Sequence, residues 1–202
     1  MANHTLNQAM EARRSIYAIG KDISVSQKEI QGVIEHALTY VPSAFNGQSP
    51  RIVLLFGEAH DRLWGDIVME TLRKIVPAEH FSQTEEKINA FKAGYGTALF
   101  FEDTAVTQNL MDQFALYKDN FPVWAQQANG MLQYTIWIGL ADIGLGASLQ
   151  HYNPLIDDQV KRTWKVPGSW KLLAQMPFGQ PHETAEPKDK LPMSERLEVF
   201  SK

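Results

Sequence analysis

No cysteine occurs among the 202 residues of this sequence. Its absence excludes disulfide bonds, thiolate nucleophiles, thiolate-bound zinc and iron–sulfur clusters, and it fits a reducing compartment. The sequence also lacks an excess of positive charge, since its formal net charge is -4 at pH 7. A protein that binds nucleic acid non-specifically needs a surplus of basic residues on one face, so we do not expect that function.

Targeting signals and long apolar runs are missing as well. The first seven residues contain neither a basic n-region nor an apolar h-region, which argues against a secretory signal. The most apolar stretch, residues 131–149, is interrupted by Gln133, Asp142 and several glycines. It falls short of the roughly 20 apolar residues of a transmembrane helix. We therefore expect a cytoplasmic protein.

Several local motifs of catalysis are absent. Neither a GxGxxG nor a Walker A pattern occurs, so the sequence does not indicate a Rossmann unit for a nicotinamide cofactor. A GxSxG nucleophile elbow is also missing. No second histidine stands at ligand spacing from His151, and we therefore expect no metal site.

The patterns that are present alternate between helices and strands and predict one α+β domain over residues 1–202. Helices are expected over 6–14, from Ser26 to before Pro42, and over 58–74, 82–93, 105–117, 121–143 and 154–164. Strands are expected over 51–57, 97–102 and 170–178, with extended chain over 144–149. Ser26 with Glu29, and Ser82 with Glu85, form capping-box patterns. The continuous apolar run at 51–57 predicts a strand buried on both faces.

Two regions predict contact with a second subunit. The helix at 121–143 is apolar almost all round, which in a small chain suggests burial against a partner as well as against its own sheet. The C-terminal extension, residues 179–202, is rich in proline and charge and resembles a disordered tail in composition. It nevertheless carries the apolar residues Leu191, Met193, Leu197, Val199 and Phe200. We expect this extension to wrap a partner subunit.

Four polar segments have the chemistry to bind a phosphate and a planar heterocycle. Arg13-Arg14-Ser15 near the start and Lys188-Asp189-Lys190 near the end supply guanidinium and ammonium groups. Between them, residues 42–48 and 148–154 carry Asn and Gln amides. Each segment also has a plain structural explanation: a helix C-terminus, a turn, a strand end with a lone histidine, and a solvated run of charges.

The order of these segments resembles that of the FMN-dependent nitroreductases. It is most similar to the short subfamily of fungal fatty-acid-repression-mutant-type proteins and their bacterial relatives, and the resemblance covers almost the whole chain. It implies an α+β fold with a mixed central sheet surrounded by helices. It also implies an intertwined homodimer that holds FMN at the subunit interface.

The resemblance assigns cofactor-binding residues in the first two segments. In the family, the Arg-x-Ser segment contacts the FMN phosphate, ribityl chain and pyrimidine edge, and here it corresponds to Arg13, Arg14 and Ser15. Tyr17 stands where many members have Lys. The loop Pro-Ser-x-x-Asn-x-Gln contacts the flavin from the neighbouring subunit, and its polar residues here are Ser43, Asn46 and Gln48.

The last two segments are assigned in the same way. In the family, the strand and loop that correspond to Leu149, Gln150 and His151 pass one face of the isoalloxazine, where a backbone N–H lies near flavin N5. Lys188 and Lys190 match the Lys-x-Arg-Leu-Pro segment at the phosphate, with Lys190 in place of Arg and Arg196 as a further guanidinium. Some aromatic side chains either line the space above the flavin or pack in the core: Phe45, Phe121, Trp124 and Tyr134.

The activity implied by the resemblance is NAD(P)H-dependent reduction of nitroaromatic or quinone-type acceptors by hydride transfer in a ping-pong cycle. No side chain is expected to act as an essential acid or base. Two other functions remain open at this point. One is a flavin reductase for a different acceptor, such as an enone or a modified amino acid, and the other is a non-catalytic flavin-binding or regulatory protein.

Overall fold

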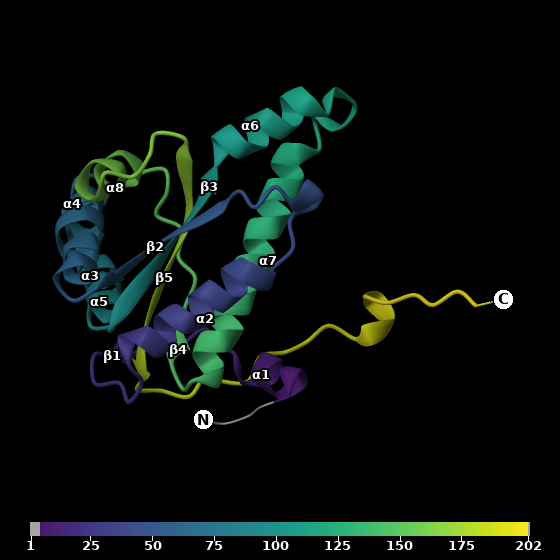
Figure 1. Cartoon of the computed structure of the whole chain (residues 1–202). Coiled ribbons are helices and arrows are strands. Elements are labelled where there is room, and N and C mark those ends of the chain that lie inside the picture. The colour runs from purple at the N-terminus through teal and green to yellow at the C-terminus, as the bar shows by residue number, and fades with distance from the viewer. Residues whose placement is uncertain (1–4, 202) are drawn as a thin grey trace.

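An antiparallel sheet of five strands separates two groups of helices (Figure 1). The computed structural model describes residues 5–201. The strands are β1 (Ile19–Gly20), β2 (Pro50–Phe56), β3 (Gly96–Asp103), β4 (Gly146–Ala147) and β5 (Trp170–Pro181). Their order is β1-β5-β3-β2, with β4 also paired to β5. The predicted α+β class is confirmed. The strands pair antiparallel, and parallel pairing among the described residues is limited to an isolated bridge between Ser15 and Ala147.

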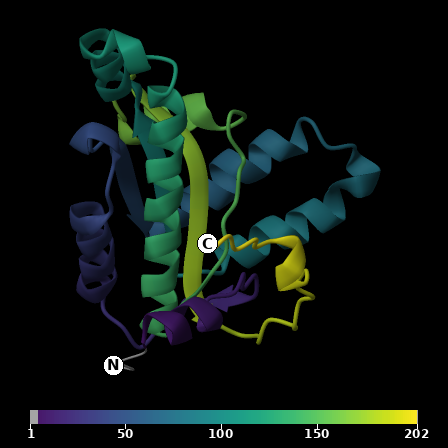
Figure 2. The same ribbon diagram turned by 90° about the vertical axis from the view of Figure 1, so that its right-hand side faces the viewer.

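One group of helices covers the sheet face that carries Leu99 and Phe101 of β3. It contains α3 (Glu58–Arg62), a π-helical turn (Leu63–Met69), α4 (Glu70–Arg73), α5 (Phe81–Lys92) and α8 (Asp157–Trp164). The other group contains α1 (Leu6–Ala12), α2 (Gln27–Tyr40), α6 (Thr104–Gln113) and α7 (Phe121–Asp142). Figure 2 shows α2 beside α7, with α1 across the lower end of α7. Because successive strand residues point to opposite faces, Ala98 and Phe100 of β3 pack on this second side.

The capping box predicted at Ser26 is confirmed. The Ser26 hydroxyl accepts the Glu29 N–H at 3.2 Å, and the Glu29 carboxylate accepts the Ser26 N–H at 2.8 Å. The box predicted at Ser82 is wrong. His80 already has helical backbone angles (φ -109°, ψ 0°), so Ser82 lies inside α5, whereas a capping residue needs extended backbone.

The strand predicted at 51–57 forms as β2 but is not buried on both faces. It is an edge strand of the sheet, and Leu55 alone among its residues is fully buried in the described chain. A continuous apolar run reports the composition of a strand and does not report its position in the sheet.

Two helices end earlier than predicted. Arg13 follows α1 with extended backbone (φ -65°, ψ 111°), and this places Arg13 and Arg14 in a segment outside the helix. The helix predicted over 105–117 breaks at Phe114 (φ -124°, ψ 62°) into α6 and a 3₁₀ turn at Ala115–Tyr117.

Helix α7 buries one face and leaves a second apolar stripe uncovered. Its buried apolar residues follow helical spacing: Phe121, Ala125, Ala128, Leu132, Ile136 and Leu140. Val123, Met131 and Tyr134 of the same helix remain 55%, 44% and 39% exposed. The sequence predicted burial of this helix on nearly all sides, but within this chain one face is buried and the apolar stripe on another face stays exposed.

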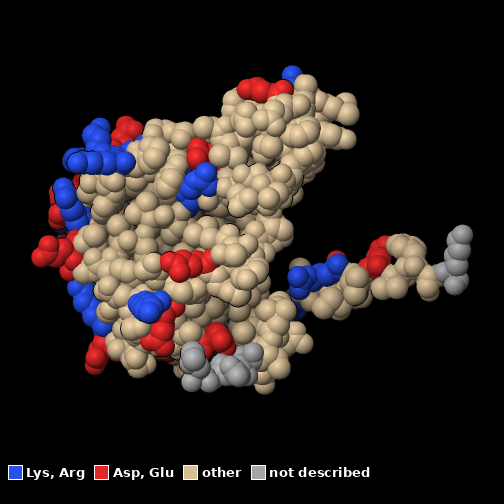
Figure 3. Space-filling model, viewed as in Figure 1, with Lys and Arg blue, Asp and Glu red and all other residues tan. Residues whose placement is uncertain are grey.

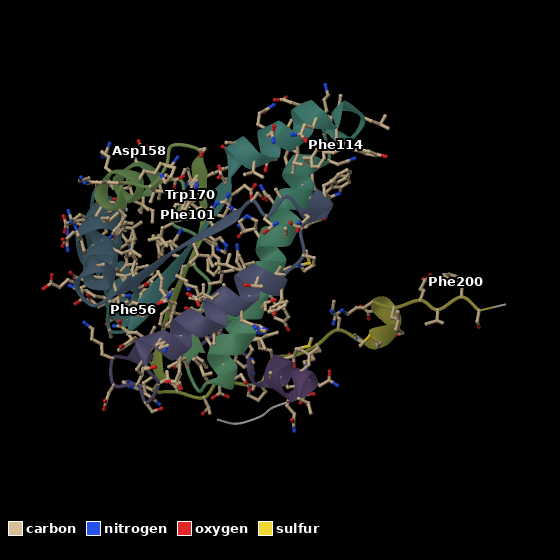
Figure 4. All side chains as sticks on the ribbon, in the orientation of Figure 1. Phe56, Phe101, Phe114, Asp158, Trp170 and Phe200 are labelled. Atoms are coloured by element: carbon tan, nitrogen blue, oxygen red, sulfur yellow. The ribbon has the colours of Figure 1, made fainter. Side chains whose placement is uncertain are left out.

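The C-terminal segment leaves the body after β5 and runs past α1 (Figure 1). It contains a 3₁₀ turn at Met193–Glu195. Leu191, Val199 and Phe200 are 65%, 78% and 90% exposed, and Figure 4 shows Phe200 far from the core. Within residues 5–201, no helix is both long enough and apolar enough to span a bilayer.

Candidate functional site

The segment after α1 lies along β4, where two hydrogen bonds converge on one carbonyl group. The Ile16 N–H donates to the Ala147 carbonyl at 3.0 Å, and the Trp137 indole N–H donates to it at 3.2 Å. Ser15 forms the parallel bridge with Ala147. These contacts fix the Arg13–Ser15 segment beside the chain that continues from β4 into residues 148–151.

Arg13 combines a stacked guanidinium with an unused donor. Its guanidinium carbon lies 4.5 Å from the ring centroid of Trp137 and 5.8 Å from that of Tyr134, which are cation–π distances. The Arg13 Nε is buried and has no hydrogen-bond partner among the described residues. Buried donors are almost always paired. Arg13 also has no carboxylate partner among the described residues, so its stacked guanidinium suits an anionic ligand.

The chain that follows β5 is tied to the same segment. Arg14 Nη2 donates to the Glu186 carbonyl at 2.5 Å. One oxygen of Glu183 accepts the backbone N–H groups of Tyr17 and Ala18 at 3.0 and 3.2 Å. These bonds, the one from Tyr17 foremost, lower the pKa of Glu183.

The Arg14–Glu186 hydrogen bond limits how far Lys188 and Lys190 can lie from the Arg13 segment. Lys188 follows Glu186 by two residues and Lys190 by four, so their Cα atoms lie within about 7 and 14 Å of Glu186. Lys188, Lys190 and Arg196 are exposed, and their side chains have no partner among the described residues. Among the described residues no bond joins them to the Arg13 segment, so their assignment to the phosphate stays a prediction.

Residues 149–151 are attached to β5 through Gln175, which is fully buried. Gln150 and Gln175 exchange backbone hydrogen bonds of 2.7 and 2.9 Å. The Gln175 side-chain oxygen also accepts the Tyr152 N–H at 2.7 Å. Gln150 itself points inward and donates to the Ser148 hydroxyl at 3.0 Å. Leu149 and His151 alternate with it and lie on the other side of this extended segment, where His151 is exposed.

The loop at 43–48 has an unusual backbone. Phe45, Asn46 and Gln48 have φ of 54°, 51° and 50°, in the left-handed region that residues other than glycine rarely adopt. The Ser43 hydroxyl stabilises the loop by accepting the Gln48 N–H at 2.8 Å. Arg51 donates to the Gln48 carbonyl at 2.5 Å and pairs with Asp103 at 3.1 Å. Strained backbone held in place by several contacts is typical of ligand-binding loops.

Phe45 projects from this loop into an aromatic cluster near the start of α7. Its ring centroid lies 4.7 Å from that of Phe114, 5.2 Å from Phe121 and 6.1 Å from Trp124. Figure 4 shows Phe114 at the tip where α6 meets α7. Phe45 is 49% exposed. Of the four aromatic candidates, three therefore share this cluster, while Tyr134 lies beside Arg13.

The predicted site residues thus form two groups in one chain. Arg13 lies against Trp137, and Arg14 and Ser15 follow it beside the start of the 148–151 segment. The ring of Tyr17 lies 6.3 Å from that of Phe91 on α5. The 43–48 loop lies near Trp124. These tryptophans are 13 positions apart on α7, which corresponds to about 20 Å along the helix axis. The structure does not bring the two groups together within this chain.

Three supporting residues were not predicted from sequence: Trp137, Gln175 and Glu183. Gln175 is the one polar residue inside the apolar run 172–178, and that interruption was a usable signal. Trp137 gave no signal, because an aromatic residue on an apolar helix is ordinarily part of the core. Within residues 5–201, no cluster of His, Asp and Glu could hold a metal ion.

Comparison with known proteins supplies the family. Residues 10–180 match the model described as the Nitroreductase family. HBN1 of Saccharomyces cerevisiae is 32% identical over 199 residues, which is 98% of this chain and 97% of that protein. The nitroreductase FRM2 of the same yeast is 29% identical over 95% of both chains.

A solved bacterial structure is similar along its whole length. The nitroreductase CinD from Lactococcus lactis, in complex with nicotinic acid, is 42% identical and superposes with a TM-score of 0.91. The match covers 98% of this chain and 100% of CinD. CinD has also been solved with chloramphenicol and with 4-nitrophenol.

Proposed function

Because the chain belongs to the nitroreductase family and is thus an oxidoreductase by descent, we propose that it is an FMN-dependent enzyme that oxidises NADH or NADPH. It reduces nitroaromatic or quinone-type acceptors in a ping-pong cycle. The observation that carries the proposal is the stacked guanidinium of Arg13, whose buried Nε lacks a partner among the described residues.

The residues of the Arg13 group fit a flavin nucleotide. Arg13, Arg14, Lys188 and Lys190 would hold the phosphate, with Arg196 as a further cation, because charge-assisted hydrogen bonds are the strong ones for such a group. Ser15 and Tyr17 would lie beside the cofactor, and the 149–151 segment would cover one face of the ring. When bound, FMN supplies hydride acceptance and electron transfer. A protein of the same fold from Desulfovibrio desulfuricans is described in complex with FMN.

The second group of residues supports a shared site in a homodimer. Ser43, Asn46 and Gln48 lie about 20 Å along α7 from the Arg13 group, which fits contact with a flavin held by the other protomer. The uncovered apolar stripe of α7 and the exposed apolar residues of the C-terminal segment provide surface for that partner. In Figure 3 the edge of the molecule along α6 and α7 is largely uncharged, whereas charged side chains gather over α3, α4 and α8.

The relatives and the aromatic cluster support the proposed acceptor class. CinD binds chloramphenicol and 4-nitrophenol, which both carry a nitrophenyl group, and nicotinic acid, which shares its pyridine ring with nicotinamide. Phe45 is half exposed within its cluster and offers a flat apolar surface to such a ring.

The experiment is a visible absorption spectrum of the purified protein, recorded before and after anaerobic addition of NADH and then NADPH. We expect flavin bands that bleach on addition of one of them. After anaerobic removal of the nicotinamide, a nitroaromatic acceptor should restore the bands, as a ping-pong cycle requires. Bands that stay unbleached would favour a binding or regulatory protein, and a colourless protein that FMN cannot reconstitute would contradict the proposal.

A further inference from the structure

A buried polar side chain interrupts the apolar strand β5 beside the segment proposed to cover the flavin. Gln175 is fully buried, and its neighbours Ala174 and Met176 belong to the core cluster on the α2 and α7 side of the sheet. Because successive strand residues point to opposite faces, the Gln175 side chain lies on the other face, in register with Leu99. A buried amide costs free energy unless both its oxygen and its nitrogen are hydrogen-bonded.

The chain that continues from β4 runs beside β5, and its backbone pairing ends at Gln150 (Figure 1). There Gln150 and Gln175 exchange two backbone hydrogen bonds. Two residues further in the same register, Tyr152 would face Leu173. The pairing of β5 with β3 shifts register at Leu173, so β5 is irregular at this point. The Tyr152 N–H has no backbone acceptor in the described chain.

The Gln175 side chain takes the place of that backbone acceptor. Its oxygen accepts the Tyr152 N–H at 2.7 Å, and its amide nitrogen donates to Asn153 Oδ1 at 3.3 Å. The two backbone bonds to Gln150 measure 2.7 and 2.9 Å. With two bonds through its backbone and two through its side chain, one buried residue thus holds residues 150–153 against the sheet.

The edge of this segment that faces away from β5 carries unused donors. Because hydrogen-bonding groups alternate between the two sides of an extended chain, the N–H groups of Leu149 and His151 point away from β5. Neither N–H has a hydrogen-bond partner within residues 5–201. His151 is exposed and Leu149 is half-buried. Two backbone donors at a fixed spacing suit the ring nitrogens and carbonyl oxygens of a planar heterocycle.

We infer that Gln175 is a positioning residue for the flavin site, which fixes the free backbone edge of residues 149–151 for contact with the ring. The inference rests on the proposed function, because it takes the ligand of this edge to be FMN. Hydrogen bonds weaken steeply with misalignment, so a loosened edge binds the ring less well. The oxidised and reduced rings differ in charge and in which nitrogens carry hydrogen, so the two affinities should change unequally.

The first test measures whether Gln175 holds the segment in the full-length protein as purified. Gln175→Met keeps an unbranched side chain of similar length and removes both hydrogen-bonding groups. Hydrogen exchange of the backbone amides of residues 150–153, compared with that of β3, should become faster by about tenfold or more. Asn129→Leu is the matched control, since it removes another fully buried amide, which donates to the Phe101 carbonyl. It should leave exchange at 150–153 unchanged.

The second test measures the bound flavin in the same variants. Gln175→Met should lose FMN on dialysis faster than the wild type. Its two-electron midpoint potential, measured anaerobically against a reference dye, should shift by about 30 mV or more, which is a tenfold change in the ratio of the affinities for reduced and oxidised FMN. Asn129→Leu should keep that ratio within about twofold, because a loss of stability alone does not distinguish the two redox states.

The outcomes separate the inference from the proposed function. If Gln175→Met exchanges at the wild-type rate, or holds FMN at the wild-type potential, the inference is overturned and the proposed function stands. A wild-type protein that takes up no flavin would overturn the proposed function and the inference with it.

Should Gln175→Met not fold, Asn153→Ala decides. Asn153 is half-buried, and its replacement removes the acceptor of the Gln175 amide. The variant should show faster exchange at residues 150–153 and a change of about threefold or more in the ratio of the two FMN affinities. Wild-type values of both would overturn the inference.

Discussion

At the scale of single residues, a series of hydrogen bonds from Trp64 through Thr97 to Lys92 holds the neutral His60 in the core. The Trp64 indole N–H donates to the Thr97 hydroxyl at 2.8 Å, and that hydroxyl lies 2.8 Å from Nδ1 of His60. His60 Nε2 lies 3.2 Å from the Lys92 carbonyl. A neutral imidazole with its proton on Nε2 satisfies every member of this chain. Burial lowers the pKa of His60 from 6.5 to about 4.

The stability of the protein should therefore depend on His60 in mildly acid solution. Because the folded-state pKa is below that of the unfolded chain, the unfolded chain binds the proton first as the pH falls. The contribution of His60 is fully present above pH 6.5 and is lost between 6.5 and about 4, to a total on the order of 3 kcal/mol.

Urea unfolding measured across this pH range checks the prediction. His60→Gln should be less stable at neutral pH by about 1 to 3 kcal/mol, through lost hydrogen bonds, but should show a flatter dependence on pH. His36→Gln, which changes an exposed histidine of α2, should retain the slope of the wild type. An unchanged slope in His60→Gln would show that other groups cause the acid sensitivity.

The assignment of Arg13 to the FMN phosphate can be tested by mutation. Replacing Arg13 and Lys190 together by Ala removes two of the cations proposed for the phosphate, and the dissociation constant for FMN should rise by about 100-fold or more. Lys28→Ala with Arg162→Ala removes the same charge from exposed positions on α2 and α8 and should leave FMN affinity intact. The measurement is the flavin content after dialysis, together with circular dichroism to establish folding. Full flavin content in the first pair would refute the phosphate assignment.

At the scale of elements, strand β5 packs closely at Gly179 against the backbone of β1 and of the residues that precede β3. A Cβ on Gly179 would collide with the Gly20 carbonyl oxygen and would lie 3.0 Å from the Tyr95 nitrogen and 3.2 Å from the Gly94 Cα. All of these atoms belong to backbone, which cannot rotate away as a flexible side chain can. β1, β5 and the start of β3 are therefore held at a spacing that only glycine permits here.

Gly179→Ala should destabilise the protein by about 2 kcal/mol or more, as overpacking against fixed backbone does. Gly168→Ala is the matched control, since no atom lies within 4 Å of its added Cβ, and it should change stability by less than about 0.5 kcal/mol. Chemical denaturation of both variants gives the comparison. Equal stabilities would mean that the strands can separate at little cost.

The elements that sequence predicts well are those set by local pattern. The box at Ser26 and the helix that follows it depend on residues three or four positions apart, and both are confirmed. The edge position of β2 and the stacking of Arg13 on Trp137 depend on residues far apart in sequence, so no local pattern contains them. The positive φ of Phe45 and Gln48 was equally hidden, because neither residue type favours that conformation.

At the scale of the whole molecule, the chain leaves many large apolar side chains of the C-terminal segment and of α7 exposed. The core clusters on the two sides of the sheet include no residue beyond Phe178. The segment that follows carries exposed apolar and basic residues together. We therefore expect it to contribute to association and to cofactor binding, and not to the folding of the protomer.

Deletion of residues 187–202 should separate these roles. The truncated chain should unfold with nearly the stability of the isolated protomer, yet dimerise more weakly and lose FMN. Lys188→Gln with Lys190→Gln, in the full chain, should lose FMN while remaining dimeric. Sedimentation velocity and flavin absorbance read the two properties separately, and a truncated protein that keeps both would contradict the proposed role of the segment.

The separation of the Arg13 group from the 43–48 loop along α7 has a consequence for genetics. If each site combines one group from each protomer, an Arg13 variant and a loop variant such as Asn46→Ala with Gln48→Ala fail in different halves of the site. Co-expressed in equal amounts, the two inactive chains would assemble into mixed dimers that contain one intact and one doubly defective site. Random pairing would restore roughly a quarter of the wild-type sites. Intragenic complementation of this kind would be expected between an allele that changes the Arg13 group and one that changes the 43–48 loop. Two alleles that change the same group would not complement each other.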